Sequence, residues 1–415
     1  MRILFVHQNF PGQFLHLAPA LAARGHDVLA LTAEANRRPS PVRVVRYRNP
    51  PAAGSGGLAK TYTETATRGA ITARAAAQLT VAEGFVPDLV IGHGGWGETL
   101  FLREVWPAAR HLTYAEFYYH SRGLDTDFDP EFRREGLDAR ILTAARRAHL
   151  LMALADADAA IAPTDFQAAT FPAELRDKIS VIHDGVDTVR LRPDPGARLT
   201  LPGGRVVSAG DEVISFVARN LEPYRGYHVF MRALPAVMAA RPEAQVVVVG
   251  GDGQSYGPPP GAGQSWKQRF LDEVAGRVDP ARLHFPGRVP YADFIALMQI
   301  TRAHAYLSYP FVLSWSMLEA MSAGALVIGS RTPPVEEVIR DGVNGRLVDF
   351  FDVAGWSAAL VAALADPAAA APLRAAARAT VQDRYDLARV CLPRLLALVE
   401  GLAPGRPAGA DLPGA

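Results

Sequence analysis

Short apolar runs alternate with longer stretches of helical periodicity through the first half of the chain. Unbroken apolar runs are typical of strands buried on both faces of a parallel sheet, and the periodic stretches between them predict helices that cover those faces. The pattern therefore predicts a doubly wound α/β domain. The expected strands are RILFVH, HDVLALT, VRVVRY, PDLVIGH, RHLTYAE, AAIAP and ISVIHDG, and the longest expected helices lie near 61–84 and within 131–157.

The same rhythm starts again in the second half, after the Pro/Gly-rich stretch RLRPDPGARLTLPGGRVVSAG. The expected strands there are VISFVAR, AQVVVVGG, RLHFPGRV, AHAYLSYP, ALVIGS and GRLVDFF. We expect two Rossmann-like domains whose carboxyl-edge loops face each other across a cleft. The expected divisions are a first domain at 1–190, a linker at 191–211, a second domain at 212–385, a helix at 386–402 that packs back on the first domain, and a disordered tail at 403–415. Two further Gly/Pro-rich stretches, 49–57 and 252–265, are expected to be mobile loops.

Composition narrows the class of protein. The 415 residues carry a formal net charge of +1 and no basic block, so the electrostatic footprint of a nucleic-acid binder is absent and a small-molecule partner is expected. Cys391 is the single cysteine, which excludes an internal disulfide and a multi-thiolate zinc site. No apolar run reaches the roughly 18 residues of a membrane span, and the first run is too short for a secretory leader. We expect a cytoplasmic protein, with peripheral membrane contact left open.

An isolated acid stands out in the apolar stretch FVLSWSMLEAMSAG. A helix is expected to begin near Ser314 to Ser316, just after a strand, which places Glu319 about one turn inside it. The N–H groups and positive dipole of such a helix end suit a diphosphate, while an acid beside them can accept hydrogen bonds from ribose hydroxyls. The alternative is an acid placed there only because it favours the helix dipole.

Two further strand ends carry residues suited to the same ligand. The stretch VARNLEPYRGYHVF delivers Arg219 and Arg225 into a loop, where two permanently charged donors could bind a diphosphate or simply be solvated. The first strand leads into HQNFPGQF, where Gly12 permits close approach to a ligand or makes a plain turn. A dinucleotide fingerprint needs three glycines there, so a dehydrogenase is disfavoured.

Together these residues carry a resemblance. The stretch FVLSWSMLEAMSAGALVIGSRTPPVEEVIRDGVNGRLVDF, with ARNLEPYRG, HFPGRV and ADAAIAPTDFQAATFP, resembles the retaining glycosyltransferases of family 4, which have the GT-B fold. The similarity is strongest over 212–350 and keeps the same order, more weakly, over 1–190. The resemblance implies a nucleoside-diphosphate sugar, such as a UDP or GDP sugar, held mainly by the second domain, and an acceptor held mainly by the first.

The resemblance also implies roles for individual residues. Glu319 matches the family acid that binds ribose, and Arg219 and Arg225 match its diphosphate-binding basic pair. Further donor-binding positions are Gly12 and Gln13 near the phosphates, Gly287, Arg288 and Val289 beside the base, and Ser314, Trp315, Ser316 and Met317 with their amides toward the phosphate. The family has a second acid eight positions before the ribose acid, but this chain has Phe311 there. That departure favours a deoxy or otherwise less polar donor sugar, and packing beneath the donor loop is the alternative.

In the first domain, Glu116 stands where family members often place a histidine near the reacting carbon. Glu116 and His120 are therefore the candidate catalytic residues, able to stabilise developing positive charge or orient an acceptor hydroxyl, although Glu116 could equally pair with Arg122. His93 matches a family histidine near the cleft, and Trp96 could stack on a sugar ring; both could instead be structural. The acidic triplet at Asp125 to Asp127 resembles the metal-binding triplet of the other large glycosyltransferase fold, but it lies in a first-domain loop away from the proposed diphosphate site, so we interpret it as chance spacing. Arginines and a helix dipole can neutralise a leaving diphosphate without metal.

The expected function is transfer of a sugar from a nucleoside-diphosphate sugar to an acceptor hydroxyl with retention at the anomeric carbon. No cofactor and no metal are expected beyond the donor itself. The alternatives are a nucleotide-sugar epimerase on the same fold, and a non-catalytic nucleotide-binding protein, which the loss of an acid at Phe311 invites. The base, the sugar, the acceptor and the oligomeric state do not follow from the sequence.

Overall fold

The protein was analysed as a computed structural model that describes residues 1–48, 57–261 and 263–403. The described chain forms two compact units. Among the described residues, unit 1 comprises those within Met1–Gly123, Arg134–Gly185 and 388–403, and unit 2 comprises those within Leu124–Arg133 and Val186–Leu387. Most of the expected loop at 49–57, residue 262 of the second expected loop, and nearly all of the expected tail lie outside the described residues.

Unit 1 is built on a parallel sheet. Its strand order, β3-β2-β1-β4-β5-β6-β7, places the first strand at the centre, with β2 on one side and β4 on the other. Every residue of β4 is buried, which is why this strand reads as an unbroken apolar run. The strands are β1 (Arg2–Val6), β2 (Asp27–Ala33), β3 (Arg43–Tyr47), β4 (Leu89–His93), β5 (Arg110–Tyr114), β6 (Ala159–Ala162) and β7 (Ile179–Val181).

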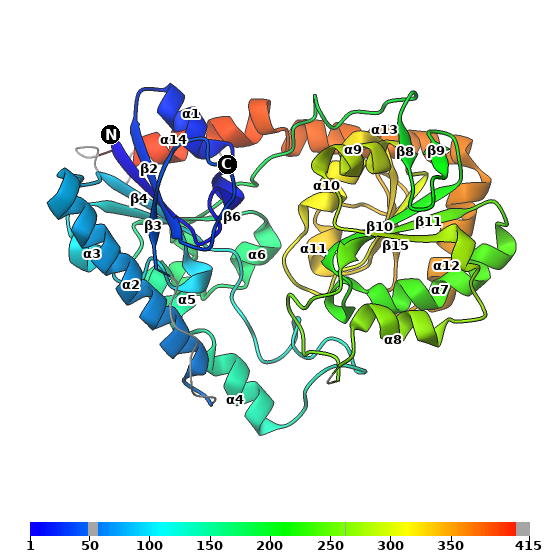
Figure 1. Ribbon diagram of the computed structural model, residues 1–415, viewed down its shortest axis with the longest axis horizontal. Helices are drawn as coiled ribbons and strands as arrows, with labels where there is room; N and C mark the ends of the chain where they lie inside the picture. Colours follow the sequence, from blue (N-terminus) through cyan, green and yellow to red (C-terminus); the bar gives the residue numbers. More distant parts are fainter. Residues whose placement is uncertain (49–56, 262, 404–415) are drawn as a thin grey trace. The chain divides into compact units, whose positions relative to one another are not determined.

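Helices cover both faces of this sheet (Figure 1). One core joins α1 and α14 to the sheet through Leu17, Leu21 and Leu396, and another joins α2 and α3 through Leu79 and Leu102. The helices are α1 (Leu17–Ala23), α2 (Lys60–Glu83), α3 (Leu102–Val105), α4 (Leu137–Ala145), α5 (Ala148–Ala155), α6 (Asp165–Ala169) and α14 (Leu392–Gly401). The single helix expected within 131–157 is therefore two helices, with residues 131–136 outside either of them.

Unit 2 repeats the plan with a parallel sheet of order β12-β11-β10-β13-β14-β15. Helices α9, α10 and α13 cover one face, and α7, α8 and α12 cover the other (Figure 1). The strands are β10 (Val213–Asn220), β11 (Gln245–Gly251), β12 (Leu283–Gly287), β13 (Ala303–Tyr306), β14 (Leu326–Ser330) and β15 (Arg346–Val348). The helices are α7 (Tyr227–Ala240), α8 (Trp266–Glu273), α9 (Tyr291–Ile300), α10 (Trp315–Ala323), α11 (Pro333–Glu336), α12 (Val353–Ala365) and α13 (Pro367–Arg384). The predicted fold class, two doubly wound parallel-sheet α/β domains, is confirmed.

The stretch expected to be a linker at 191–211 is instead part of unit 2. It contains the antiparallel hairpin of β8 (Arg198–Thr200) and β9 (Val206–Ser208), and Leu191, Leu201 and Val207 enter the core of the unit. Its Pro and Gly residues thus mark turns of an ordered hairpin rather than a free connection. After α13 the chain returns to unit 1, where α14 packs with α1.

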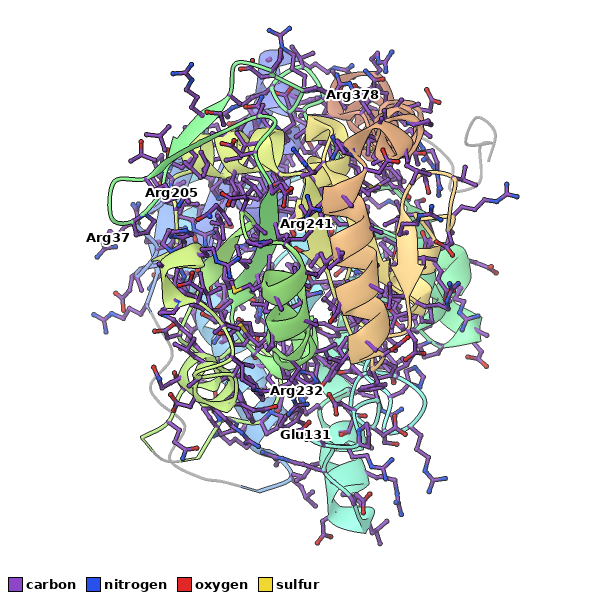
Figure 2. The ribbon with its side chains drawn as sticks, turned by 90° about the vertical axis from the view of Figure 1, so that its right-hand side faces the viewer. Arg37, Glu131, Arg205, Arg232, Arg241 and Arg378 are labelled. Carbon is purple, nitrogen blue, oxygen red and sulfur yellow. The ribbon has the colours of Figure 1, made fainter. Side chains whose placement is uncertain are left out.

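Residues 124–133, which we call the strap, are the unexpected part of the topology. They follow the fifth strand of unit 1 in sequence, yet they pack into unit 2. The Asp129 carboxylate is 2% exposed, accepts a 2.6 Å hydrogen bond from the Tyr309 hydroxyl and lies 3.1 Å from Nε2 of His228. Glu131 accepts both ends of the Arg232 guanidinium, at 2.7 and 2.9 Å, and Figure 2 labels this pair.

Aromatic side chains complete the attachment of the strap. The Phe128 ring lies 5.1 Å from the rings of both Tyr309 and Phe350, and the Phe132 ring lies 5.1 Å from that of Trp266. Because an acid, an ion pair and two half-buried rings anchor ten residues, the strap is part of unit 2.

Candidate functional site

In unit 1, three neighbouring strands end beside one another and present polar side chains. His7 follows β1, His93 ends β4, and Glu116 lies two residues beyond the last residue of β5. Strand β4 pairs with both β1 and β5 in parallel, so the carboxyl ends of all three strands lie at one edge of the sheet. This edge is where doubly wound domains bind their ligands.

A chain of contacts converges on Glu116. Nε2 of His7 lies 2.9 Å from Oε1 of Gln13, and Nε2 of Gln13 donates to Oε1 of Glu116 at 3.4 Å. From the other side, Nε2 of His93 lies 3.6 Å from Oε2 of Glu116. The structure therefore brings together three of the residues predicted from the sequence, Gln13, His93 and Glu116.

The orientation of His93 follows from its surroundings. Its Nδ1 accepts the Gly95 backbone N–H at 3.0 Å, so the proton of a neutral ring is on Nε2, directed at Glu116. The His93 ring is stacked on Trp96 with centroids 4.0 Å apart. One face of Trp96, which was expected to be available to a sugar ring, is thus covered by His93. Both side chains line a hollow in unit 1, together with Glu116, Tyr119 and Phe171.

Gly12 has a definite steric role in this cluster. Its backbone has φ of +50°, and a Cβ atom there would lie 2.5 Å from Nε2 of His7. Only glycine allows both the left-handed conformation and the close approach of the imidazole. The expected contact of Gly12 with donor phosphates remains a prediction.

His120, the second candidate catalytic residue, has a backbone partner. Its Nε2 lies 2.7 Å from the backbone oxygen of Thr170, to which it donates. Tyr118 contacts its ring edge-on, with centroids 5.7 Å apart. The catalytic role of His120 stays a prediction.

In unit 2, Glu319 lies where the sequence places it, one turn inside α10. Its carboxylate is half-buried and accepts a 2.7 Å hydrogen bond from the hydroxyl of Tyr291 on α9. Burial raises the pKa of Glu319 above its ordinary value, and the hydrogen bond from Tyr291 opposes that change. An acid that is desolvated by its setting yet still reachable is suited to bind hydroxyl groups of a ligand.

The amides at the start of α10 are only partly available to a phosphate. The Ser314 N–H donates to the Tyr306 hydroxyl at 2.7 Å, and the Met317 N–H donates to the Ser314 oxygen at 3.3 Å. The hydroxyls of Ser314 and Ser316 lie 3.1 Å apart, and Trp315 is 42% exposed beside them. The N–H groups of Ser314 and Met317 therefore already have acceptors within the protein. Phosphate binding by the start of α10 stays a prediction.

The two arginines expected to act as a pair have different surroundings. Arg225 is buried, and its Nη1 donates to Oγ of Ser308 at 2.8 Å and to the Val312 oxygen at 2.9 Å. It therefore holds the loop before α10 in place. Arg219 is exposed, and its side chain makes no hydrogen bond or ion pair with any other residue that the structure describes. Arg219 is thus the better placed of the two to bind an anion.

Phe311 is 3% exposed. Its ring lies 4.9 Å from that of Tyr256 and 5.6 Å from that of Tyr224, both edge-on. The Arg225 guanidinium lies 5.8 Å from the same ring. These contacts support the packing interpretation of Phe311, since its neighbours already cover its ring.

The predicted base-side loop meets a polar group that the sequence did not single out. Arg288 donates to Oδ1 of Asn220 at 3.3 Å, and Nδ2 of Asn220 donates to the Ser255 hydroxyl at 2.7 Å. Gly287 has φ of +74°, while Val289 packs toward the core. Asn220 ends β10 one position after Arg219, so its place at a strand end was the available signal.

Three other polar residues were also missed. Glu222 is 1% exposed and accepts the N–H groups of Ser255 and Tyr256, at 3.3 and 3.1 Å. Burial raises the pKa of Glu222, although these N–H groups oppose it. The others are His7 and Tyr291, described above. A histidine directly after the first strand was a visible signal for His7, whereas nothing local indicated Tyr291.

The acidic triplet at Asp125 to Asp127 lies in the strap, where Asp125 accepts a 3.1 Å hydrogen bond from the Tyr224 hydroxyl. Across the described ranges, no group of three His, Cys, Asp or Glu side chains is arranged to hold a metal ion. Within the same ranges no single helix is long and apolar enough to cross a membrane; α12 and α13 meet that test only as a pair bent by 101°.

Two doubly wound parallel-sheet domains, with polar residues gathered at the carboxyl ends of their strands, define the GT-B class of glycosyltransferase folds. Residues 24–191 match the family model described as Glycosyl transferase family 4 group, and residues 205–380 match that of Glycosyl transferases group 1. The chain therefore belongs to the family 4 glycosyltransferases.

Named relatives agree with this assignment. A D-inositol 3-phosphate glycosyltransferase of Streptomyces avermitilis is 31% identical over 57% of this chain and 50% of its own length. A GDP-mannose-dependent alpha-(1-6)-phosphatidylinositol monomannoside mannosyltransferase of Mycolicibacterium smegmatis is 30% identical over 54% and 56%. The chain spans about half the length of the curated relatives it matches.

Solved structures share the fold at low sequence identity. Sucrose-phosphate synthase from Thermosynechococcus elongatus superposes with a TM-score of 0.72 and 19% identity, covering 96% of this chain and 98% of its own. Anabaena HepE in complex with UDP and glucose superposes with a TM-score of 0.65 and 17% identity, covering 97% and 100%.

Proposed function

We propose that this protein transfers a sugar from a nucleoside-diphosphate sugar to an acceptor hydroxyl with retention at the anomeric carbon. The observation that carries the proposal is the half-buried carboxylate of Glu319, one turn inside α10 and beside the exposed Trp315. An acid for ribose and a helix N-terminus for a diphosphate thus occur on the same helix.

On the donor side, we assign the ribose hydroxyls to Glu319, where they replace or join the hydroxyl of Tyr291. The diphosphate is bound by the first amides of α10 and by the exposed Arg219. Negative charge develops on the diphosphate as its bond to the sugar breaks, and these groups stabilise that charge. Arg225 contributes by fixing the loop before α10.

On the acceptor side, we assign the reacting centre to the hollow of unit 1. Retention requires that the acceptor oxygen bond to the anomeric carbon on the face from which the diphosphate leaves. Glu116, with Gln13 and His93 directed at its two oxygens, can stabilise positive charge on the sugar or orient the acceptor hydroxyl. His120 is the less supported member of the predicted pair.

The relatives and solved neighbours limit the choice of donor nucleotide for this chain. One relative is named as GDP-mannose-dependent, and solved neighbours hold UDP or UDP-glucose. We therefore propose a UDP or GDP sugar as co-substrate and no separate cofactor. Since nucleotide sugars and a single cysteine both fit a reducing compartment, we propose that the protein acts in the cytoplasm.

A binding and turnover experiment tests the proposal. Thermal unfolding is measured with UDP, GDP, UDP-glucose and GDP-mannose. Ligands with one of the two bases should raise the Tm and ligands with the other should leave it unchanged, because only a ligand that binds the folded state stabilises it. Donor turnover with an acceptor panel, followed by proton NMR of the product, reports the anomeric configuration. Binding without turnover would support a non-catalytic nucleotide-binding protein, and conversion of the donor sugar without acceptor would support an epimerase.

A further inference from the structure

We infer that His7 is a positioning residue: it fixes the side-chain amide of Gln13 so that the amide N–H, not the amide oxygen, is presented to Glu116. The inference rests on the proposed role of Glu116 at the reacting centre. Nothing in the sequence pattern assigned a role to His7, which lies immediately after β1.

The protonation of His7 is fixed by its surroundings. The ring is 2% exposed, and burial, with a smaller contribution from His93, lowers its pKa to about 3. It is therefore neutral at physiological pH and has one ring proton. Nδ1 accepts the Asn9 backbone N–H at 2.9 Å, which leaves that proton on Nε2.

The proton on Nε2 determines how Gln13 is turned. Nε2 of His7 is 2.9 Å from Oε1 of Gln13, so the amide oxygen accepts from His7 and the NH₂ group lies on the side of Glu116. In the reverse orientation, the NH₂ group of Gln13 would face the N–H of His7, and the amide oxygen of Gln13 would face the carboxylate of Glu116. Both contacts would then be repulsive, so the imidazole selects one of the two amide orientations.

The packing around His7 maintains this arrangement. The ring meets Trp96 edge-on with centroids 4.9 Å apart, and it meets His93 at 90° with centroids 5.7 Å apart. Phe14 meets the ring edge-on with centroids 6.0 Å apart, and Gly12 lies so close that a Cβ atom there would be 2.5 Å from Nε2. His7 and the turn at Gly12 therefore act together to orient the side chain of Gln13.

Two substitutions at His7 separate positioning from plain packing. His7→Leu removes the donor, and the kcat for donor turnover, measured with UDP-glucose and GDP-mannose, should fall about 10- to 100-fold while KM for the donor changes less than about twofold. His7→Gln places an amide N–H near the original Nε2, and it should restore most of the lost kcat. Equal activity of His7→Leu and wild type, or equal loss in both variants, would overturn the inference.

A matched pair of glycine substitutions gives a second test. Gly12→Ala should lower kcat as His7→Leu does, because its Cβ displaces the imidazole. Gly25→Ala is the control: Gly25 also has a positive φ, +84°, but a Cβ there meets nothing within 4 Å. Similar losses in both alanine variants would mean that backbone strain alone lowers activity, and would overturn the steric argument.

A spectroscopic readout keeps this inference separate from the proposed function. Nitrogen-15 NMR of labelled histidines, assigned with the His7→Gln variant, should show His7 as the neutral Nε2–H tautomer from pH 7 down to pH 5. An Nδ1–H tautomer, or a protonated ring at pH 6, would overturn the inference even if the enzyme is active. If NMR shows the expected tautomer but no donor is turned over, the orientation of Gln13 is supported and the proposed function is contradicted.

Discussion

The hydroxyl of Tyr291 donates a 2.7 Å hydrogen bond to Oε1 of Glu319. The guanidinium of Arg190 lies 4.7 Å from the centre of the Tyr291 ring and helps to hold that ring in place. Tyr291 thus occupies one oxygen of the acid to which we assign the ribose. A bound nucleotide either displaces this hydroxyl or uses the other oxygen, and both routes make the charge of Glu319 important for affinity.

Glu319→Gln should weaken binding of UDP or GDP, whichever binds the wild type, by about 1 to 3 kcal/mol, or about 5- to 150-fold in Kd. The amide is nearly isosteric but lacks the charge that strengthens a hydrogen bond from a hydroxyl. Isothermal titration calorimetry measures the change. Tyr291→Phe is the matched control and should alter Kd much less; unchanged affinity in Glu319→Gln would contradict the ribose assignment.

The same acid gives a pH dependence with a definite sign. Burial raises the pKa of Glu319, so its carboxylate becomes protonated earlier on acidification than an exposed glutamate does. Nucleotide affinity should therefore fall as pH decreases from 7 toward the raised pKa, and Glu319→Gln should lose this part of the fall. Identical pH profiles of Kd in the two proteins would exclude Glu319 as the titrating group.

Asp129→Asn tests how firmly the strap is attached. Burial raises the pKa of Asp129, but the hydrogen bonds from His228 and Tyr309 outweigh it, and the net pKa is lowered. Because the pKa is lower in the folded state, the ionised carboxylate stabilises that state at pH values above 3.8, the pKa in the unfolded chain. This stabilisation is lost as the pH falls through the pKa of the folded state. The substitution should reduce the unfolding free energy by about 3 to 5 kcal/mol at pH 7, and less below pH 4.

Urea unfolding across this pH range measures the effect. Asp138→Asn, on the exposed surface of α4, is the matched control and should change stability by less than about 0.5 kcal/mol. A loss at Asp129 that is the same at pH 3 and pH 7 would show that the charge of the carboxylate contributes nothing.

Phe311 distinguishes packing from sugar recognition. The Phe311 ring is buried among Tyr224, Tyr256 and Arg225. Phe311→Ala should therefore lower the unfolding free energy by about 3 to 5 kcal/mol. Phe311→Leu should cost about 1 to 2 kcal/mol, and donor preference should stay the same in both. A changed preference between deoxy and fully hydroxylated donors, with stability retained, would instead support contact with the sugar.

Donor turnover should survive removal of divalent cations. Arg219 and the start of α10 can neutralise the diphosphate by themselves. Initial rates in EDTA should therefore match those in Mg²⁺. Turnover that is lost in EDTA and restored by Mg²⁺ would contradict the arginine-and-dipole account and require a metal at the diphosphate.

The strands and long helices could be predicted because each is a local pattern. The local hydrophobic pattern was enough to predict the buried β4, the amphipathic α7 and the position of Glu319 after a strand end. Partners distant in sequence could not be predicted: Tyr291 reaches Glu319 from the preceding helix, and Arg225 turns inward to Ser308. The hairpin at 191–211 was misread because Pro and Gly mark ordered turns and linkers alike.

The strap has a consequence for how such proteins diversify. Family boundaries near residues 191 and 205 suggest that the two halves could be exchanged between relatives as independent modules. Here a module cut at that boundary would leave behind residues 124–133, and with them the acid that pairs with His228 and Tyr309. A chimera that keeps these contacts therefore has to take residues 124–133 from the same source as its second half, so the unit exchanged is not one continuous segment of the sequence.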